Sequence, residues 1–209
     1  MQFYLLTNLD ELETLNQKFN NFIQDRFESY TIIDLIKQDY KINWTFNLNH
    51  IKDELRINYF SLNQNEYKKN IKISIIHQIE KTYSYIKFHG INFHNSFTNL
   101  IFESKNNIKP LADIYSEQSI KAIVMDNAKF SGIPQIDAAN NSFTSAHKLA
   151  VGSLDKDELF YLNSLGINKI DSINIILQSL YNSLLMNYND EKILAQIWKE
   201  IENASSKRL

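Results

Sequence analysis

The feature that most limits the fold of this 209-residue chain is a series of short alternating segments between roughly Thr31 and Phe143. Apolar and polar residues alternate along each segment, which is the pattern of a β-strand with one buried face. No helical stretch separates the segments, which argues against a sheet built from alternating strands and helices. The clearest examples are Ile42–Phe46, Leu55–Tyr59, Ile71–Ile75, Tyr83–Phe88, Asn99–Glu103 and Ala122–Met125.

Two architectures carry such a pattern, a β-sandwich or a β-solenoid. The turns between the segments are rich in Asn, but the whole chain has only four Gly. Tight hairpins favour residues that tolerate positive φ, so the shortage of Gly weakens the sandwich interpretation. The sequence also lacks the strict repeat of an ideal solenoid. The strand pattern by itself leaves both architectures open.

Helical patterns flank the strand region on both sides. Apolar residues from Leu9 to Phe27 recur at three- and four-residue steps, which predicts a helix over residues 8–27. Near the other end, Asp155 with Glu158 resembles a helix-capping box, and Gly166 is a good helix terminator. Further helices are expected over residues 169–187 and from residue 189 onward. We therefore divide the chain into a helical segment 1–30, a strand core 31–150 and a helical domain 151–209.

Composition excludes several classes of function. With 22 Lys and Arg against 24 Asp and Glu, the net charge of −2 gives no reason to expect nucleic acid or an acidic membrane as a partner. The longest uncharged run, Ser172–Asn189, is full of Ser, Asn and Gln and is no membrane span. Zero Cys excludes disulfides, a Cys nucleophile and cysteine-ligated clusters. A reducing compartment is expected, and both a cytoplasm and an organelle stroma fit.

The chain carries no recognisable motif of catalysis. Four Gly hardly suffice for a phosphate-binding loop, and no nucleophile-elbow or dinucleotide-binding motif occurs. Four of the five histidines, at positions 50, 77, 89 and 94, are interpreted as turn or surface residues because no paired metal-ligand spacing connects them. The sequence therefore gives no reason to expect ATP or NAD as a ligand of this chain.

The segment 145–167 differs, because it resembles the C-terminal signature of the SufB/SufD family of iron–sulfur cluster assembly proteins. That signature runs roughly S-H-G-A-T-V-G-x-L-D-x-x-x-L-F-Y-L-x-S-R-G-I. The chain departs from it at Lys148, directly after the histidine, and at Leu165. Twelve residues match in order and without gaps: His147, Val151, Gly152, Leu154, Asp155, Leu159, Phe160, Tyr161, Leu162, Ser164, Gly166 and Ile167.

Weaker resemblance to the same family extends upstream. Segments 90–93 and 96–102 resemble the family's central coils, and Ala128–Phe130 with Pro134 resembles its last coils. The resemblance covers about residues 70–187 and leaves residues 1–60 uncovered. It implies a right-handed parallel β-helix for the strand region, followed by a small C-terminal α-helical bundle. The chain is shorter than other members, so fewer coils are expected.

The resemblance also implies a role, that of a scaffold subunit that is not an enzyme and binds no cofactor stably by itself. SufB and SufD pair through their β-helices, their C-terminal helices each dock a SufC-type ATPase, and a transient cluster is built at the SufB–SufD interface. His147 matches the position at which SufD contributes a histidine. Its neighbours Ala146 and Lys148 replace the glutamates of SufB, so the chain is SufD-like. The resemblance makes His147 an interface ligand or proton-handling residue. Lys148 places a cation beside it in sequence, and a purely structural histidine at the end of the β-helix is the alternative.

The docking surface for the ATPase is expected in residues 155–203. Its apolar residues have two interpretations, packing within the helical bundle or partial exposure toward the partner's groove, which uses the same spacing. The residues in question are Leu159, Phe160, Leu162, Ile173, Ile176, Leu177, Leu180, Leu184 and Trp198.

Two other functions stay open at this point. The chain could be a degenerate family member that keeps an interaction role only, in which case His147 has no function. It could also be a β-helix hydrolase, since such enzymes line a groove with carboxylates on adjacent coils. The candidates for that role are Asp113, Glu117, Asp126 and Asp137, which follow no coil period.

Overall fold

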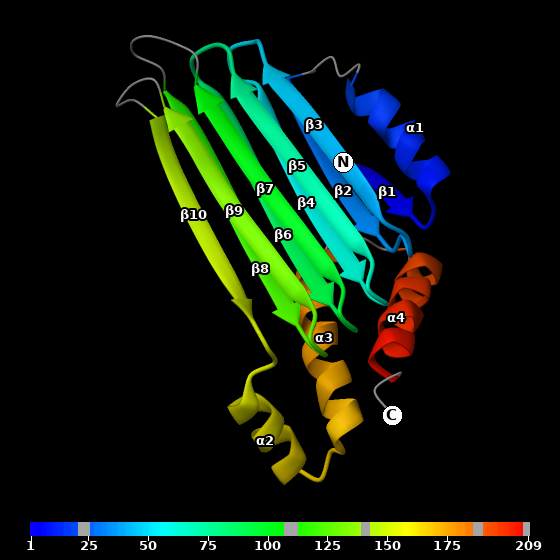
Figure 1. The fold of residues 1–209 in the computed structure, drawn as a ribbon. Coiled ribbons are helices and arrows are strands. Elements are labelled where there is room, and N and C mark those ends of the chain that lie inside the picture. Colours follow the sequence, from blue (N-terminus) through cyan, green and yellow to red (C-terminus); the bar gives the residue numbers. More distant parts are fainter. Residues whose placement is uncertain (21–25, 107–112, 139–142, 186–189, 207–209) are drawn as a thin grey trace.

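The computed structural model describes residues 1–20, 26–106, 113–138, 143–185 and 190–206, with the backbone only for 183–185 and 206. These residues form ten strands and four helices (Figure 1). The strands are β1 (Gln2–Leu6), β2 (Phe27–Asp34), β3 (Tyr40–Leu48), β4 (Glu54–Asn63), β5 (Lys68–His77), β6 (Thr82–Asn92), β7 (Phe97–Asn106), β8 (Ile114–Val124), β9 (Lys129–Ala138) and β10 (Phe143–Gly152). The helices are α1 (Leu9–Asn20), α2 (Lys156–Ser164), α3 (Lys169–Leu185) and α4 (Glu191–Ser206).

From β2 onward, consecutive strands alternate between two sheets. The order is β1-β2-β4-β6-β8-β10 in the larger sheet and β3-β5-β7-β9 in the smaller, and the paired strands are parallel in both. Two successive strands thus complete one coil, and each coil stacks on the one before it. The predicted parallel β-solenoid followed by helices is confirmed, and the sandwich alternative is wrong because neighbouring strands of a sheet are never joined by hairpins.

The turns of the solenoid explain why so few glycines suffice. Equivalent turns after β4, β6 and β8 each contain two successive non-glycine residues with positive φ, namely Asn65 and Glu66, His94 and Asn95, and Asp126 and Asn127. Asn, Asp and His enter the left-handed region more readily than most residues with a side chain. The Asn-rich composition therefore supplies the turn geometry that Gly supplies in other folds.

A ladder of buried asparagines reinforces the same corner of the solenoid. Asn63 donates from Nδ2 to the backbone oxygen of Phe97 in the following coil at 3.1 Å. Asn92 makes the equivalent bond one coil later, to the backbone oxygen of Lys129 at 2.8 Å. Both side chains are fully buried, so these bonds satisfy carbonyl groups that water does not reach. Each asparagine thereby ties its own coil to the next one.

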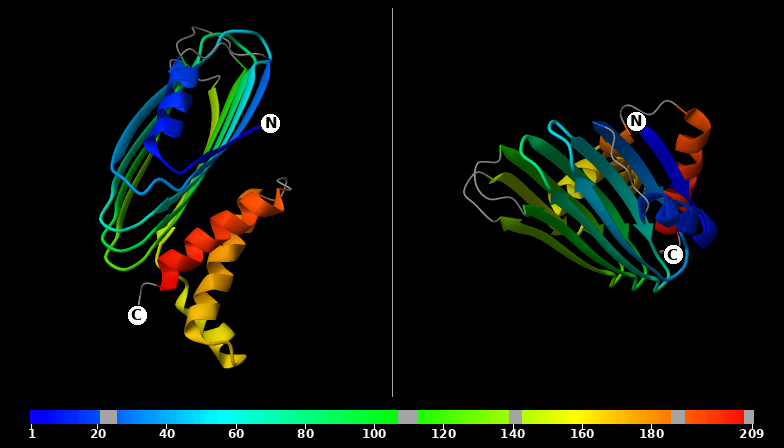
Figure 2. Two further views of the ribbon diagram at one scale, coloured as in Figure 1. Left: turned by 90° about the vertical axis from the view of Figure 1, so that its right-hand side faces the viewer. Right: turned by 90° about the horizontal axis from the view of Figure 1, so that it is seen from above.

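Helix α1 closes the N-terminal end of the solenoid, where it lies between the edges of the two sheets (Figure 2). Its residues Leu12, Leu15 and Phe19 are at most 3% exposed and join the apolar core inside the coils. Trp44 on β3 donates from its indole nitrogen to Asn16 Oδ1 at 2.8 Å. The helix thus plugs the lumen with its apolar face and is fixed to the first coil by a hydrogen bond.

The N-terminal segment differs from its predicted form in two ways. The described part of the helix runs over Leu9–Asn20, and Phe27, predicted as its last residue, begins strand β2. Residues 22 and 23 of the predicted apolar face lie outside the described residues. Residues 2–6 form strand β1, which pairs with β2 and extends the larger sheet. The prediction was wrong at Phe27 because this residue lies at a helical spacing from the preceding apolar residues and also fits the pattern of a strand.

Helices α3 and α4 pack on the outer face of the larger sheet (Figure 2). Ile33, Phe60 and Ile91 on that face join one cluster with Leu177 of α3 and Ile201 of α4. Backbone oxygens of the two helices also accept hydrogen bonds from solenoid histidines, Leu180 from His89 Nδ1 at 3.3 Å and Ala204 from His94 Nε2 at 2.9 Å. Both histidines thus connect the helices to the solenoid. Among the described helices, none is long and apolar enough to cross a membrane.

The end signals of α2 predicted from sequence are present. The Asp155 side chain accepts hydrogen bonds from the backbone N–H groups of residues 157 and 158, which caps the helix. Gly166 follows the helix with φ +85°, a conformation that L residues with a side chain rarely adopt. Local sequence therefore determines where α2 begins and ends.

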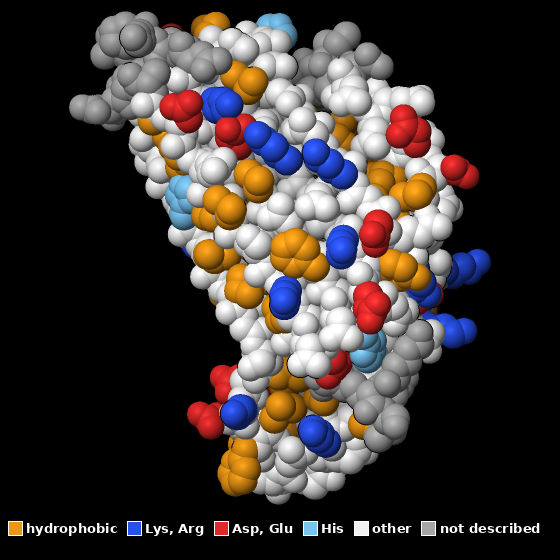
Figure 3. Space-filling view, viewed as in Figure 1, with side chains coloured by type: hydrophobic (Ala, Val, Ile, Leu, Met, Phe, Trp, Pro, Cys, Tyr) orange, Lys and Arg blue, Asp and Glu red, His pale blue; other side chains and the backbone are white. Residues whose placement is uncertain are grey.

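The outer face of the smaller sheet carries intermixed charges (Figure 3). Glu103 on β7 accepts from two lysines, Lys72 at 3.2 Å and Lys105 at 3.0 Å. Together with the Ser74 hydroxyl, these lysines hold the pKa of the Glu103 carboxyl below its usual value, against the opposing effect of its desolvation. The pairs are partly exposed, and exposed pairs contribute little to stability.

Candidate functional site

The C-terminal end of the solenoid is open in the part of the chain that the structure describes. Strand β10 is the last of the larger sheet and β9 the last of the smaller. Leu149 and Val151 on β10 are 53% and 43% exposed, although they continue the inward-facing rows of Ile120 and Ala122, which are 1% and 3% exposed. The last coil therefore presents its apolar inner face to solvent.

His147 lies on this open coil. It is exposed on β10 and pairs in register with Gln118 on β8, which pairs in turn with Ile86 on β6. Gln118 and Ile86 are buried inside the lumen, and residues paired in register project to the same face of a sheet. His147 therefore continues an inward-facing row and stands at the rim of the lumen.

Lys148 points away from His147, because successive residues of a strand face opposite sides. Its Nζ forms an ion pair with Glu117 Oε1 at 2.9 Å on the outer face of the larger sheet. This hydrogen bond lowers the pKa of the Glu117 carboxyl and raises the pKa of the Lys148 ammonium. The cation that follows His147 in sequence is thus neutralised by a carboxylate on the other side of the sheet.

A row of buried, hydrogen-bonded polar side chains leads from the middle of the solenoid toward this end. His77 Nδ1 lies 2.8 Å from the Thr82 hydroxyl, and its Nε2 lies 3.1 Å from the Ser84 hydroxyl. Ser84 donates to Ser116 at 3.0 Å, and Ser116 pairs in register with Ser145 on β10. Desolvation lowers the pKa of His77 to about 4, so the ring is neutral near pH 7.

The sequence interpretation of His77 as a turn or surface residue is therefore wrong. His77 continues the alternation of Ile71, Ile73 and Ile75 along β5, so it faces the same side of the strand as these buried residues. This position in the alternation was the sequence signal of its burial. Sequence reasoning also missed Ser116 and Gln118, which alternate in phase with Ile114 and Ile120 on β8. Polar residues in the inward phase of a strand need partners inside the protein, which single-sequence patterns do not reveal.

Most residues predicted to dock a partner are covered by the chain itself. Ile173, Ile176, Leu177 and Leu180 are at most 8% exposed and pack in the cluster beneath α3. Leu159, Leu162 and Trp198 are partly buried against the same cluster, whereas the side chain of Leu184 lies outside the described residues. These positions favour packing within the bundle over a docking surface.

Phe160 is the exception among the predicted docking residues. It is 75% exposed on α2, and its neighbours Tyr161 and Leu165 are 61% and 60% exposed. The helix lies at the far end of the helical bundle from the solenoid (Figure 1). These three residues on α2 and its C-terminal cap, here called the α2 patch, are apolar side chains that pack against little of the described chain.

The carboxylates weighed for a hydrolase do not converge. Glu117 faces the outside of the larger sheet, and Asp137 lies on β9 in the smaller sheet. Asp113 precedes β8 and Asp126 follows it, so the two stand at opposite ends of one strand. Within the described residues, no three His, Asp or Glu side chains gather where they could hold a metal ion. The hydrolase alternative thus has no assembled site.

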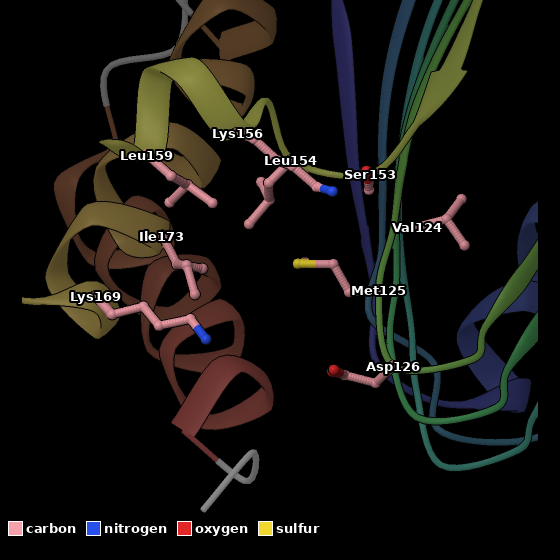
Figure 4. Close-up of a pocket in the computed structure, with 9 residues that line it drawn as sticks. All are labelled: Val124, Met125, Asp126, Ser153, Leu154, Lys156, Leu159, Lys169 and Ile173. Atoms are coloured by element: carbon pink, nitrogen blue, oxygen red, sulfur yellow. The ribbon is translucent and has the colours of Figure 1, made fainter. Parts of the chain in front are cut away.

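A cleft separates the helical bundle from the rim of the solenoid (Figure 4). Met125 from the rim and Leu154 and Ile173 from the helical region face one another across it, with Lys156 and Lys169 on the helical side. The cleft lies beyond the outer face of the larger sheet, whereas His147 belongs to the inner face. It is therefore separate from the candidate site at the open end.

Comparison with protein families identifies the class to which this fold and site belong. The model described as "SUF system FeS cluster assembly, SufBD core domain" matches residues 21–180. The chain belongs to this family, and its role lies in iron–sulfur cluster assembly. The match begins well upstream of the segment in which the motif resemblance was seen, so most of the solenoid is covered. No curated protein matches the chain.

Proposed function

We propose that the chain is a SufD-like, non-catalytic subunit of an iron–sulfur cluster assembly complex. The single observation that carries the proposal is the position of His147, which the family signature marks, on the exposed last strand of the solenoid. The chain has no Cys and therefore no thiolate for a cluster of its own. A transient cluster is then a substrate of the complex, and its other ligands come from a partner. A cytoplasmic or stromal location agrees with this role.

The open end of the solenoid is the proposed contact with a SufB-like chain. At this end β9 and β10 are the last strands, and Leu149 and Val151 on β10 are 53% and 43% exposed. Both strands also end their sheets, and a sheet edge offers unpaired backbone groups that a partner's strand can satisfy. A partner bound at this end would cover the apolar surface and place its own side chains beside His147.

The α2 patch is the proposed contact with a SufC-like ATPase. Aromatic residues that are exposed as a group on one helix are typical of interface anchors. Of the docking residues predicted from sequence, Phe160 is the one that this surface retains. The buried stripe of α3 would then hold the bundle against the solenoid while α2 receives the ATPase.

Co-expression of the tagged chain with the SufB-like and SufC-like proteins of its host tests the proposal. We expect one complex that contains all three proteins. Leu149→Asp should remove the SufB-like protein from it, and Phe160→Asp should remove the ATPase that this chain binds. Ile51→Asp is the matched control, because Ile51 is 48% exposed in a turn remote from both surfaces and should change neither. Recovery of the chain alone, folded and stable, would contradict the scaffold role.

The role of His147 needs a separate measurement. In the intact complex, His147→Ala should reduce the yield of assembled cluster, as followed by visible absorbance, without changing the subunit composition. A complex that assembles clusters at the wild-type level with His147→Ala would support the degenerate, interaction-only role instead. The purified chain is expected to be colourless and to hydrolyse no ATP.

A further inference from the structure

Gln118 crosses the lumen of the solenoid one coil before the open end. The side chain is fully buried on β8, and its Nε2 donates to the backbone oxygen of Gln135 on β9 at 3.2 Å. This bond ties one sheet to the other and fixes which end of the amide faces β9. The remaining amide atom, Oε1, has no hydrogen-bond partner within the described residues, although it is buried. A buried acceptor that lacks a donor costs free energy.

One of the two neighbours of Gln118 in its row is a candidate donor. In this row of the larger sheet, Ile57 and Ile86 on β4 and β6 precede Gln118, and His147 on β10 follows it. The two isoleucines have no polar side-chain atoms, whereas an imidazole ring carries an N–H group in every protonation state that occurs near pH 7. Adjacent strands are about 4.8 Å apart, so the His147 ring can reach the Gln118 amide by rotation about its side-chain torsions.

We infer that Gln118 is a positioning residue for His147. Its Oε1 accepts a hydrogen bond from one ring nitrogen of His147, which fixes the tautomer and the orientation of the ring. In the neutral ring, the other nitrogen carries the lone pair, which faces the open end and can bind a metal ion. The use of that lone pair for the cluster rests on the proposed function above, but the hydrogen bond and the tautomer do not.

The test is a measurement of the His147 tautomer in the full-length chain. Histidine labelled with ¹⁵N gives separate ring-nitrogen signals for the two neutral tautomers, and the His147→Gln variant assigns them. At pH 8, wild-type protein should show one dominant tautomer. Gln118→Met keeps the length of the side chain but removes its acceptor, and it should shift the tautomer ratio about two- to tenfold, the effect of one net hydrogen bond.

Two further variants separate positioning from a structural effect. Gln118→Glu retains an acceptor at the same distance along the side chain and should keep the wild-type tautomer. Ser116→Ala removes a hydroxyl two residues away from Gln118 on the same inward face of β8 and should leave the ratio unchanged. The inference is overturned if folded Gln118→Met has the wild-type ratio, or if Ser116→Ala shifts it as much. Should Gln118→Met fail to fold, an equal mixture of tautomers in the wild-type chain overturns the inference by itself.

The outcome is separable from that of the proposed function. A fixed tautomer in a chain that recruits no SufB-like partner would uphold the positioning role and refute the scaffold role. A complex whose cluster yield depends on His147, but whose yield and His147 tautomer are both unchanged by Gln118→Met, would refute the positioning role alone.

Discussion

The two ends of the solenoid differ although the coils between them follow one pattern. At the N-terminal end, Leu12, Leu15 and Phe19 of α1 enter the lumen and are at most 3% exposed. At the C-terminal end, Leu149 and Val151 occupy inward-facing positions and are about half exposed. A stacked-coil protein must cover both terminal coils. The described residues of this chain cover one end by helix α1 and leave the other open, which is where we propose that a partner binds.

The largest difference between the ends should appear when one inward-facing apolar side chain at each end is replaced by alanine. Phe19→Ala leaves a cavity in the packed plug and should lower the free energy of unfolding by about 3–5 kcal/mol. Leu149→Ala in the isolated chain should change it by less than about 0.5 kcal/mol, since the side chain is exposed. Urea unfolding of both variants measures the effects. Equal losses would show that the C-terminal end is covered in solution.

The interior of the closed half contains a buried ion pair that has no counterpart in the described open half. Lys69 Nζ lies 2.8 Å from Asp34 Oδ2 and 2.8 Å from the Leu62 oxygen, and both charged side chains are fully buried. Lys69→Met should destabilise the chain by about 3–5 kcal/mol, because Asp34 is left as an unpaired buried charge. Lys72→Met, on the exposed face of the same strand, should cost less than about 1 kcal/mol. Similar losses in the two variants would contradict this assignment.

Strand β5, which carries Lys69, also buries the neutral His77, and this predicts a pH dependence. The pKa of His77 is about 4 in the folded chain, below its ordinary value of 6.5. The unfolded chain therefore binds a proton first as the pH falls, and stability is lost between pH 6.5 and pH 4. The slope is up to about 1.4 kcal/mol per pH unit for this group. Unfolding of wild type and His77→Gln across this range should show a shallower slope in the variant; identical slopes would refute the prediction.

The smallest effect concerns the hydrogen bond that fixes the plug. Asn16→Ala leaves the partly buried indole N–H of Trp44 without its acceptor and should cost about 1–2 kcal/mol. Asn20→Ala, at an exposed position of the same helix, should stay within about 0.5 kcal/mol. The urea denaturation midpoints of the two variants measure these effects, provided that the dependence of the unfolding free energy on urea concentration is unchanged. If both variants unfold like wild type, apolar packing alone holds α1 in place.

Much of the fold could be predicted from sequence because it depends on local patterns. The period-two alternation located strands β3 to β7 and the end of β8, and Asp155 and Gly166 marked the ends of α2. The motif around His147 identified the family. Strand β1 and the place of Phe27 in strand β2 were missed, because each depends on which distant segment pairs beside it, and no local window contains that segment. The burial of His77 was missed although its phase along β5 indicated it.

The sequence by itself determined which residues alternate, and hence which side chains of each strand face the lumen. Ile120 and Leu149 are equivalent in that pattern, and they pair in register on adjacent strands. Only the tertiary structure decided that Ile120 is 1% exposed and Leu149 is 53% exposed. The physical reason is that alternation sets the direction of a side chain, whereas the exposure of that side chain depends on whether another coil, helix or molecule is stacked above it.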